Sequence, residues 1–535
     1  MSLIRFENVS KRYDKIQVLK DVYFQLSRGE RIGLIGKNGS GKTTALRLIL
    51  GREEPDEGVV EIESKIRIGY FSQFSELDGN KAVLDILEEL FGDVHSLKMK
   101  LKYIGEELGK NYPESELDHL ARKQASLLEE MEHCGGWTYQ NRIETVVSRL
   151  GFSRNHQLRP IEQLSGGWKN RAALAQILLE EPDVLLMDEP TNYLDIEGQA
   201  WLETWFRKFR GGLVVVSHDR QFLDSVVTRI IEIESYHFQE YRGDYTEYVR
   251  KKQTKMKTLE RQFQHEEELL AYESEAIADR REALRDPSAA LKRKMANIKK
   301  RTVPRPVDQI VTALYRGAHV PNVLAKVSGL SKEYADQLLF IDLSFEIERG
   351  DRVVIIGPNG CGKSTLIKCL VEQVQPDTGE INLGKNAGLA YFNQIAGELD
   401  PKDTVSHAVN IYGEAFNAPR KAVNRFLNLM RFSEESLYQR IGTLSGGQRA
   451  RVALAKCLLS GAGLIVLDEP TNHLDITSSQ VIERALVNFF GAVVVVSHDR
   501  FFIDKVATRM LVFDGSGEVC QVNGNWTIWS AARSG

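Results

Sequence analysis

Short runs of apolar residues recur along the chain, and polar residues or glycine follow each run. In the first half the runs are RIGLI at 31–35, VLLM at 184–187 and LVVV at 213–216. In the second half they are RVVII at 352–356, LIVL at 464–467 and AVVVV at 492–496. Continuous β-branched runs of this length are typical of buried strands in a parallel sheet. Helix-forming runs, TALRLIL and TLIKCL, follow the first strand of each half, so the pattern predicts an α/β fold.

The two halves of the chain are copies of each other. Four landmarks recur at one constant offset: Tyr13, Gly36, Lys42 and Gln73 match Tyr334, Gly357, Lys363 and Gln394. Three more recur at a second, smaller offset: Ser165, Asp188 and His218 match Ser445, Asp468 and His498. The first copy therefore holds 41 extra residues between Gln73 and Ser165. We predict two domains of one kind, at 1–240 (copy one) and 323–535 (copy two), each with its own core.

Two helical segments have no counterpart in the other copy. The first lies at about 92–136, where two amphipathic helices about a Gly-Lys-Asn-Tyr-Pro turn account for the insertion. The second occupies 241–322, between the copies. Apolar residues recur there every seven positions, at Met256, Phe263, Leu270, Ile277 and Leu284. We predict a small helical insert in copy one and a long helical hairpin as the linker.

Composition excludes several classes of protein. With 42% apolar and 27% charged residues the chain has the composition of a globular protein rather than a disordered one. No apolar run approaches the ~18 residues of a membrane span, and the first residues lack a secretion signal, so we expect a cytoplasmic protein. The five cysteines form no CxxC pair, which argues against a disulfide framework and a zinc or iron–sulfur site.

Charge is distributed unevenly, although the net charge is only −4. Residues 280–305 carry ten basic and two acidic residues, a net of +8, which leaves −12 for all other residues. A basic segment on an acidic protein suits the phosphate backbone of RNA. A solvated helix face is the alternative. The candidate RNA-binding residues are Arg280, Arg281, Arg285, Lys292, Arg293, Lys294, Lys299, Lys300 and Arg301.

Each copy contains a glycine-rich loop of the form GxxxxGK[ST] between its first apolar strand and the following helix. The loop of copy one comprises Gly36, Lys37, Asn38, Gly39, Ser40, Gly41, Lys42, Thr43 and Thr44. That of copy two comprises Gly357, Pro358, Asn359, Gly360, Cys361, Gly362, Lys363, Ser364 and Thr365. Backbone N–H groups and a helix N-terminus cradle polyphosphate in such loops. The lysine then contacts the β- and γ-phosphates, and the hydroxyl of Thr43 or Ser364 binds Mg²⁺.

Further candidates for phosphate chemistry lie at the ends of the other strands. Asp188 and Asp468 can hold Mg²⁺ through water, while Glu189 and Glu469 can orient or deprotonate the attacking water. His218 and His498 can position that water, and Gln73 and Gln394 can bind Mg²⁺ or the water. Tyr13 and Tyr334 can stack on adenine. Taken singly, each of these residues could instead be an ordinary strand-end or surface residue.

The motif LSGG, at 164–167 and 444–447, precedes each acidic strand, and DEPTN continues that strand. With these motifs the chain resembles the ATP-binding cassette (ABC) superfamily over about 3–240 and 323–530. The resemblance implies two P-loop ATPase domains that sandwich two ATP–Mg²⁺ between the loop of one copy and the signature of the other. Lys42 and Glu189 would then face Ser445, Gly446 and Gly447, while Lys363 and Glu469 face Ser165, Gly166 and Gly167. It also implies that Asp195 and Asp475 couple the two sites.

Two fused cassettes without a membrane domain, a helical insert and a long charged linker resemble the ABC-F subfamily. That resemblance implies a monomeric ATPase that binds the ribosome, with the linker near P-site tRNA and rRNA. It would modulate translation or protect against ribosome-targeting antibiotics. One departure is Trp168, where the usual signature has glutamine, so we expect two active but unequal sites.

Three other functions within the superfamily fit the sequence less well. A transporter subunit with separate membrane subunits explains both cassettes but leaves the basic linker without a role. A DNA-repair or chromosome ATPase would carry a far longer coiled coil or zinc ligands. A ribosome-recycling ABC protein would need cysteine clusters for an iron–sulfur domain.

Overall fold

The computed structural model describes most of the chain. The described residues are 2–14, 16–37, 39–72, 77–110, 112–192, 194–255, 257–258, 321–334, 337–385, 387–393, 399–413, 420–430, 432–471, 474 and 476–534. They form two compact units, built mainly of residues 1–240 and of residues 241–535. The two units have the same architecture, and each is described by itself.

The first unit contains a six-stranded sheet in the order β5-β6-β7-β3-β8-β9. Its strands are β3 (Arg31–Gly36), β5 (Ile68–Phe71), β6 (Val184–Asp188), β7 (Gly212–Val216), β8 (Arg229–Glu234) and β9 (His237–Arg242). The pairs from β5 to β8 are parallel, and every residue of β7 is buried. The three apolar runs of the first half are therefore strands β3, β6 and β7, as predicted. Because β3, β6 and β7 are parallel, the loops after them meet at one edge of the sheet.

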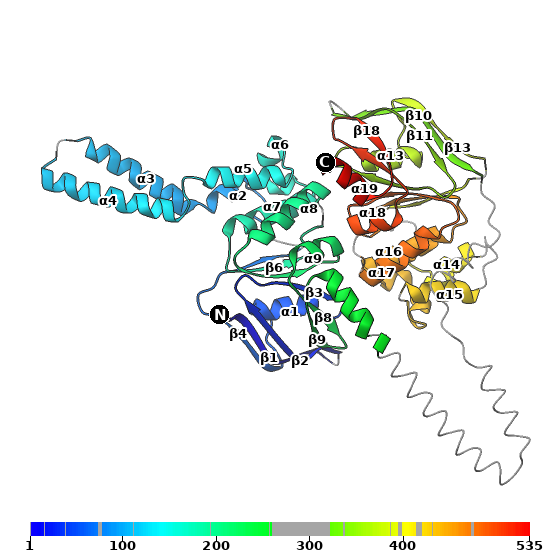
Figure 1. The fold of residues 1–535 in the computed structure, drawn as a ribbon, viewed down its shortest axis with the longest axis horizontal. Helices are drawn as coiled ribbons and strands as arrows, with labels where there is room; N and C mark the ends of the chain where they lie inside the picture. The colour runs from blue at the N-terminus through cyan, green and yellow to red at the C-terminus, as the bar shows by residue number, and fades with distance from the viewer. Residues whose placement is uncertain are drawn as a thin grey trace, which may run out of the picture. The chain divides into compact units, whose positions relative to one another are not determined.

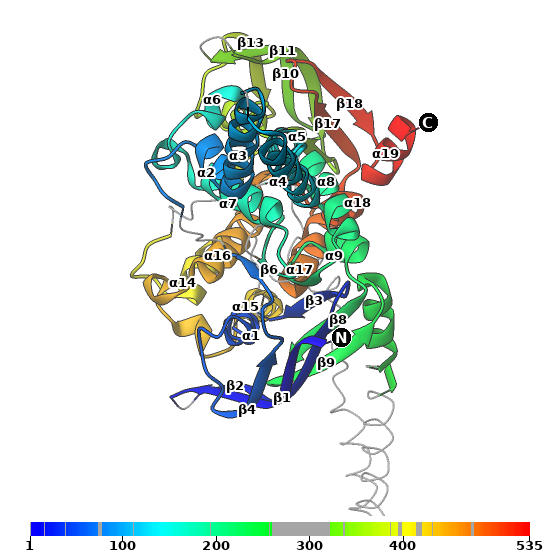
Figure 2. The same cartoon turned by 90° about the vertical axis from the view of Figure 1, so that its left-hand side faces the viewer.

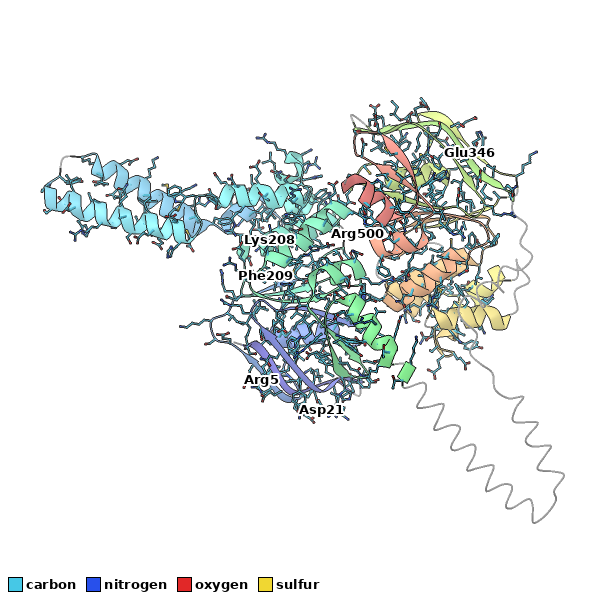
Figure 3. All side chains as sticks on the ribbon, viewed as in Figure 1. Arg5, Asp21, Lys208, Phe209, Glu346 and Arg500 are labelled. Carbon is cyan, nitrogen blue, oxygen red and sulfur yellow. The ribbon has the colours of Figure 1, made fainter. Side chains whose placement is uncertain are left out.

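A second, antiparallel sheet of three strands packs over this layer in the order β2-β1-β4. Its strands are β1 (Ser2–Tyr13), β2 (Ile16–Ser27) and β4 (Glu57–Ile62). Arg5 and Asp21 lie on this sheet (Figure 3). One apolar core joins both sheets to helix α1 (Lys42–Ile49), with Phe6, Leu34 and Leu46 at most 2% exposed. The core fixes α1 directly behind the glycine-rich loop.

The remaining helices of the first unit pack against the parallel sheet or against one another. They are α2 (Val83–Glu89), α5 (Tyr139–Arg149), α6 (Arg154–Gln157), α7 (Gly166–Glu180), α8 (Ile196–Lys208) and α9 (Arg220–Val226). Two longer helices, α3 (Gly92–Leu108) and α4 (Glu114–His133), run side by side and extend away from the sheets (Figures 1 and 2). They form the helical insert predicted at 92–136. The turn between them contains the predicted Gly-Lys-Asn-Tyr-Pro sequence.

The second unit repeats this plan without the long helical pair. Its six-stranded sheet has the order β14-β15-β16-β12-β17-β18, and its antiparallel sheet has the order β11-β10-β13. The strands are β10 (Val323–Tyr334), β11 (Gln337–Glu348), β12 (Arg352–Ile356), β13 (Thr378–Leu383), β14 (Leu389–Phe392), β15 (Leu464–Asp468), β16 (Ala492–Val496), β17 (Arg509–Phe513) and β18 (Val519–Asn523). The helices are α13 (Lys363–Leu370), α14 (Val405–Gly413), α15 (Arg420–Leu429), α16 (Gly446–Leu458), α17 (Ile476–Val487), α18 (Arg500–Val506) and α19 (Trp526–Ser534).

The start of the predicted linker is helical over residues 245–255. All five residues of its heptad pattern and all nine candidate RNA-binding residues lie outside the described residues. Among the helices that are described, none is both long enough and apolar enough to span a membrane.

Candidate nucleotide sites

The glycine-rich loop of copy one connects the end of β3 to the start of α1. Gly41 precedes α1 with φ at 105°, a left-handed conformation that glycine adopts without strain. A β-carbon there would also lie 2.7 Å from Val18 Cγ1. Gly362 has the same conformation, with φ at 106°. Both loops therefore turn their backbone directly into a helix N-terminus, the arrangement that binds phosphate.

The loop lysines fold over their own loops. Lys42 Nζ donates to the carbonyl oxygens of Gly36 at 2.8 Å and Lys37 at 3.1 Å. Lys363 Nζ donates to Gly357 O at 2.8 Å and Pro358 O at 2.6 Å. Each ammonium group is thus held at the concave side of its loop, where a phosphate oxygen would replace a carbonyl as its acceptor.

The predicted metal carboxylate of copy one, Asp188, ends strand β6. Burial raises the pKa of Asp188, while the positive charge of Lys42 opposes that rise. Burial, followed by the charge of Asp188, raises the pKa of Tyr70 on the neighbouring strand β5. In copy two, burial and Asp468 raise the pKa of Tyr391 to about 12. Each tyrosine therefore lies near the aspartate that ends the neighbouring strand, although sequence reasoning singled out only the glutamines three residues later.

The two predicted catalytic glutamates share an unusual backbone geometry. Glu189 has φ at 53° and Glu469 at 48°, a strained conformation for a non-glycine residue that is concentrated at active sites. In each copy the backbone N–H of the glutamate donates to the last residue of the next strand, Val216 O at 2.9 Å and Val496 O at 3.0 Å. This bond fixes the backbone of each glutamate beside the strand end that leads to the following histidine.

Each histidine faces its glutamate. The backbone N–H of His218 donates to Glu189 Oε2 at 3.2 Å, and His218 Nε2 lies 3.6 Å from Oε1. His498 Nε2 lies 3.5 Å from Glu469 Oε1. Although 21% of the Glu189 side chain is exposed, its Oε1 is inaccessible to solvent. This burial, with the adjacent charge of Asp188, raises the pKa of Glu189 to about 8. The copies thus place a buried carboxylate and an imidazole together, as a water-activating pair requires.

The donor set fits Mg²⁺. Thr43, at the start of α1, offers a hydroxyl and Asp188 a buried carboxylate whose ionised form a cation would stabilise. Hard oxygen ligands of this kind are those that Mg²⁺ prefers, and one or two protein ligands suffice when phosphates supply others. Three predicted residues of the loops and metal sites, Asn38, Gln73 and Gln394, lie outside the described residues.

The LSGG segments open helices, but the two helices begin differently. In copy two, Ser445 and Gln448 form a capping box: Ser445 N–H donates to Gln448 Oε1 at 2.9 Å, and Gln448 N–H donates to Ser445 Oγ at 3.3 Å. In copy one, Ser165 stands at the same position of α7 without any side-chain capping bond among the described residues. Tryptophan has no oxygen with which to complete the box.

Trp168 instead packs into an aromatic cluster. Its ring centroid lies 4.1 Å from that of His156 and 5.0 Å from that of Phe152, and Arg171 Cζ lies 4.5 Å from it. Burial, followed by the charges of Arg159 and Arg171, lowers the pKa of His156, which favours the neutral imidazole beside the indole. The start of α7 is thus anchored by packing rather than by a cap.

The remaining predicted residues are placed less distinctively. Tyr13 and Tyr334 are the last residues of β1 and β10, and they are 40% and 48% exposed. Asp195 is the N-cap of α8 and accepts the N–H of Gly198 at 2.9 Å. Its copy-two counterpart, Asp475, lies outside the described residues.

Comparisons with known proteins agree with this geometry. The family described as ABC transporter matches residues 19–192 and 340–472. The energy-dependent translational throttle protein EttA of Escherichia coli K12 is 34% identical over 526 residues, covering 96% of this chain and 92% of the relative. ABC transporter F family member 5 of Arabidopsis thaliana is 33% identical over 522 residues, covering 96% and 75%.

The fold is also similar to that of the solved RNase-L Inhibitor, with a TM-score of 0.64, 20% identity and coverage of 99% of this chain and 92% of that one. The family matches establish that the protein is an ATP hydrolase that uses ATP with Mg²⁺. Tandem cassettes, the helical insert and these relatives together show that the chain belongs to the ABC-F family of ATP-binding cassette proteins.

Proposed function

We propose that this ABC-F ATPase binds the ribosome in its ATP-bound form and modulates translation, or protects it against ribosome-targeting antibiotics. One observation carries the proposal: the chain aligns along 92% of a protein described as a translational throttle. That alignment includes the linker region, which would have no role in a transporter subunit. We further propose that the protein acts as a cytoplasmic monomer with domains at 1–240 and 323–535, and that the basic part of the 241–322 linker contacts rRNA or P-site tRNA.

The residues of each copy have distinct proposed roles. The loop N–H groups with Lys42 or Lys363 bind the phosphates, and Tyr13 or Tyr334 stacks on adenine. Thr43 with Asp188, and Ser364 with Asp468, hold Mg²⁺, while Gln73 and Gln394 assist. Glu189 and Glu469 accept a proton from the attacking water, which His218 and His498 orient. The signature serine of the opposite copy completes each site.

Ribosome cosedimentation tests the function. We expect the protein to pellet with ribosomes in the presence of Mg²⁺ and a nonhydrolysable ATP analogue, and to remain in the supernatant without nucleotide. The Lys42→Ala, Lys363→Ala double variant is the control, because it keeps the fold but loses the phosphate ligands. Copurification with membrane subunits instead of ribosomes would favour the transporter alternative.

The two ATP sites are expected to turn over at different rates. In copy two, Ser445 Oγ accepts the N–H of Gln448, which leaves its O–H proton to donate to a phosphate. Ser165 lacks that restraint, so fixing its hydroxyl costs more entropy. This cost falls on the site that Ser165 completes, the one around Lys363. Glu189→Gln, which leaves this site active, should therefore retain a lower ATPase rate than Glu469→Gln.

Adding Trp168→Gln to the Glu189→Gln variant should restore the cap and raise the residual rate severalfold. The same change in the Glu469→Gln variant serves as the control and should have little effect. Equal residual rates for both single variants, with no response to Trp168→Gln, would contradict unequal sites.

A further inference from the structure

A carboxylate ties the predicted adenine-stacking residue of copy one to its phosphate-binding helix. Glu53 lies in the turn after α1 with 18% of its side chain exposed, and its Oε1 pairs with Arg47 NH1 at 3.1 Å. Its other oxygen, Oε2, accepts a hydrogen bond from the hydroxyl of Tyr13. That hydroxyl also lies 3.5 Å from Thr44 Oγ1, on the first turn of α1. The edge of the Tyr13 ring is therefore tied at two points to α1 and the turn that follows it.

Arg47 holds the carboxylate in this orientation. It stands in the last turn of α1, the helix that begins at the loop hydroxyls. Its hydrogen bond to Glu53 is the main cause that raises the pKa of Arg47. Because Arg47 occupies Oε1, Oε2 is the oxygen left to face the tyrosine hydroxyl.

The equivalent turn of copy two cannot form this tie. At the offset that aligns the two glycine-rich loops, Tyr334, Thr365 and Lys368 match Tyr13, Thr44 and Arg47. Val374 stands in place of Glu53. Valine has no oxygen to accept a bond from a tyrosine hydroxyl.

Other contacts of the two turns are shared. Lys11 pairs with Asp56 at 3.3 Å and Lys332 with Asp377 at 2.6 Å. The Nζ of Lys11 lies 5.9 Å from the Tyr13 ring centroid, and that of Lys332 lies 5.2 Å from the Tyr334 ring centroid. Both copies therefore have the lysine–aspartate pair beside the tyrosine, whereas valine at 374 removes the acceptor that Glu53 offers to the hydroxyl.

We propose that Glu53 is a positioning residue that presets the Tyr13 ring for adenine, so that copy one recognises the nucleotide base more tightly than copy two. The inference rests on the proposed nucleotide roles of Tyr13 and of the glycine-rich loop. A free tyrosine loses rotamer freedom when a base stacks on it, whereas a ring already fixed by its hydroxyl loses less. Base stacking on an aromatic face is favourable for any purine, so the gain appears as affinity for the base and not for the phosphates.

Calorimetric titration of the full chain tests the inference. The parent protein carries Lys363→Ala, which removes the phosphate ligand of copy two. This parent is titrated with MgATP and with magnesium tripolyphosphate, which has no base. We expect Glu53→Val, the residue of copy two, to raise the Kd for MgATP about threefold to tenfold and to leave that for tripolyphosphate unchanged. Glu53→Gln keeps an acceptor oxygen and should lose less. Glu54→Val, which removes a neighbouring carboxylate, is the matched control and should bind as the parent does.

If Glu53 acts through Tyr13, the effect of replacing Glu53 must disappear when Tyr13 is absent. In a Tyr13→Ala background, Glu53→Val should cause no further loss of MgATP affinity. The inference is overturned if Glu53→Val binds MgATP as the parent does, if tripolyphosphate weakens equally, or if the loss persists without Tyr13. A parent that binds no MgATP at all would instead contradict the proposed nucleotide site itself.

Discussion

Replacing both Glu189 and Glu469 by glutamine is expected to lower ATP turnover by about 10²- to 10⁴-fold, the usual effect of removing a positioned base. Glutamine keeps the shape of the side chain but cannot accept the proton of the attacking water. MgATP affinity should remain close to that of the wild type, because the phosphate ligands are untouched. Steady-state ATPase rates and nucleotide titration measure the two quantities. Turnover within about threefold of wild type would exclude these glutamates as the base.

The pH profile provides a second measurement of the same role. Burial raises the pKa of Glu189 to about 8, so its carboxyl is largely protonated at neutral pH before nucleotide binds. A base must be ionised to act, and kcat/KM reports ionisation of the free enzyme. In the Glu469→Gln variant, where copy one supplies the turnover, kcat/KM should therefore rise with pH up to about 8. A flat profile from pH 6 to 9 would contradict a titrating base at this position.

Replacing five basic linker residues by alanine should weaken the salt dependence of ribosome binding. The effect should be larger than that of any substitution in the cassettes. The residues are Lys292, Arg293, Lys294, Lys299 and Lys300. Each phosphate contact contributes about 0.7 to 0.9 to the slope of log affinity against log salt, so the slope should fall by roughly 3 to 4 if all five engage. Basal ATPase should change little, because none of the five belongs to a nucleotide motif. The assay is pelleting of the Glu189→Gln, Glu469→Gln form across a salt series.

A charge-matched control separates local contacts from net charge. Five exposed lysines of the cassettes, Lys20, Lys65, Lys208, Lys385 and Lys402, are replaced by alanine instead. We expect their loss to leave most of the salt slope in place. Equal slopes for the linker variant and the wild type would assign the ribosomal contact to the cassettes or to the α3–α4 helices.

Much of the fold could be predicted because its signals are local. The buried strands β6 and β7 read as continuous apolar runs, and the change of offset between the copies located α3 and α4. The glycine-rich loop could be placed because strand, glycines and helix follow one another directly along the chain. Such features depend only on residues that are close in sequence, so they can be recognised in a single sequence.

Features that depend on contacts distant in sequence could not be predicted. The strained φ of Glu189 accompanies a hydrogen bond to Val216, at the far end of the neighbouring strand β7. The bond from Tyr13 to Glu53 spans 40 residues, and no local pattern marks either partner. Trp168 departs visibly from the signature, but its stacking on His156 arises only from the packing of α6 against α7.

The Trp168 cluster gives the protein a natural optical label. The indole stacks on an imidazole and lies close to a guanidinium, neighbours whose movement alters tryptophan emission. Copy two has Gln448 at this position, so the fluorescence of Trp168 reports on the signature of copy one alone. The chain has six tryptophans, so the difference between the spectra of wild type and Trp168→Gln isolates this signal. Spectra recorded with and without nucleotide can therefore test whether the proposed nucleotide engagement at that signature takes place.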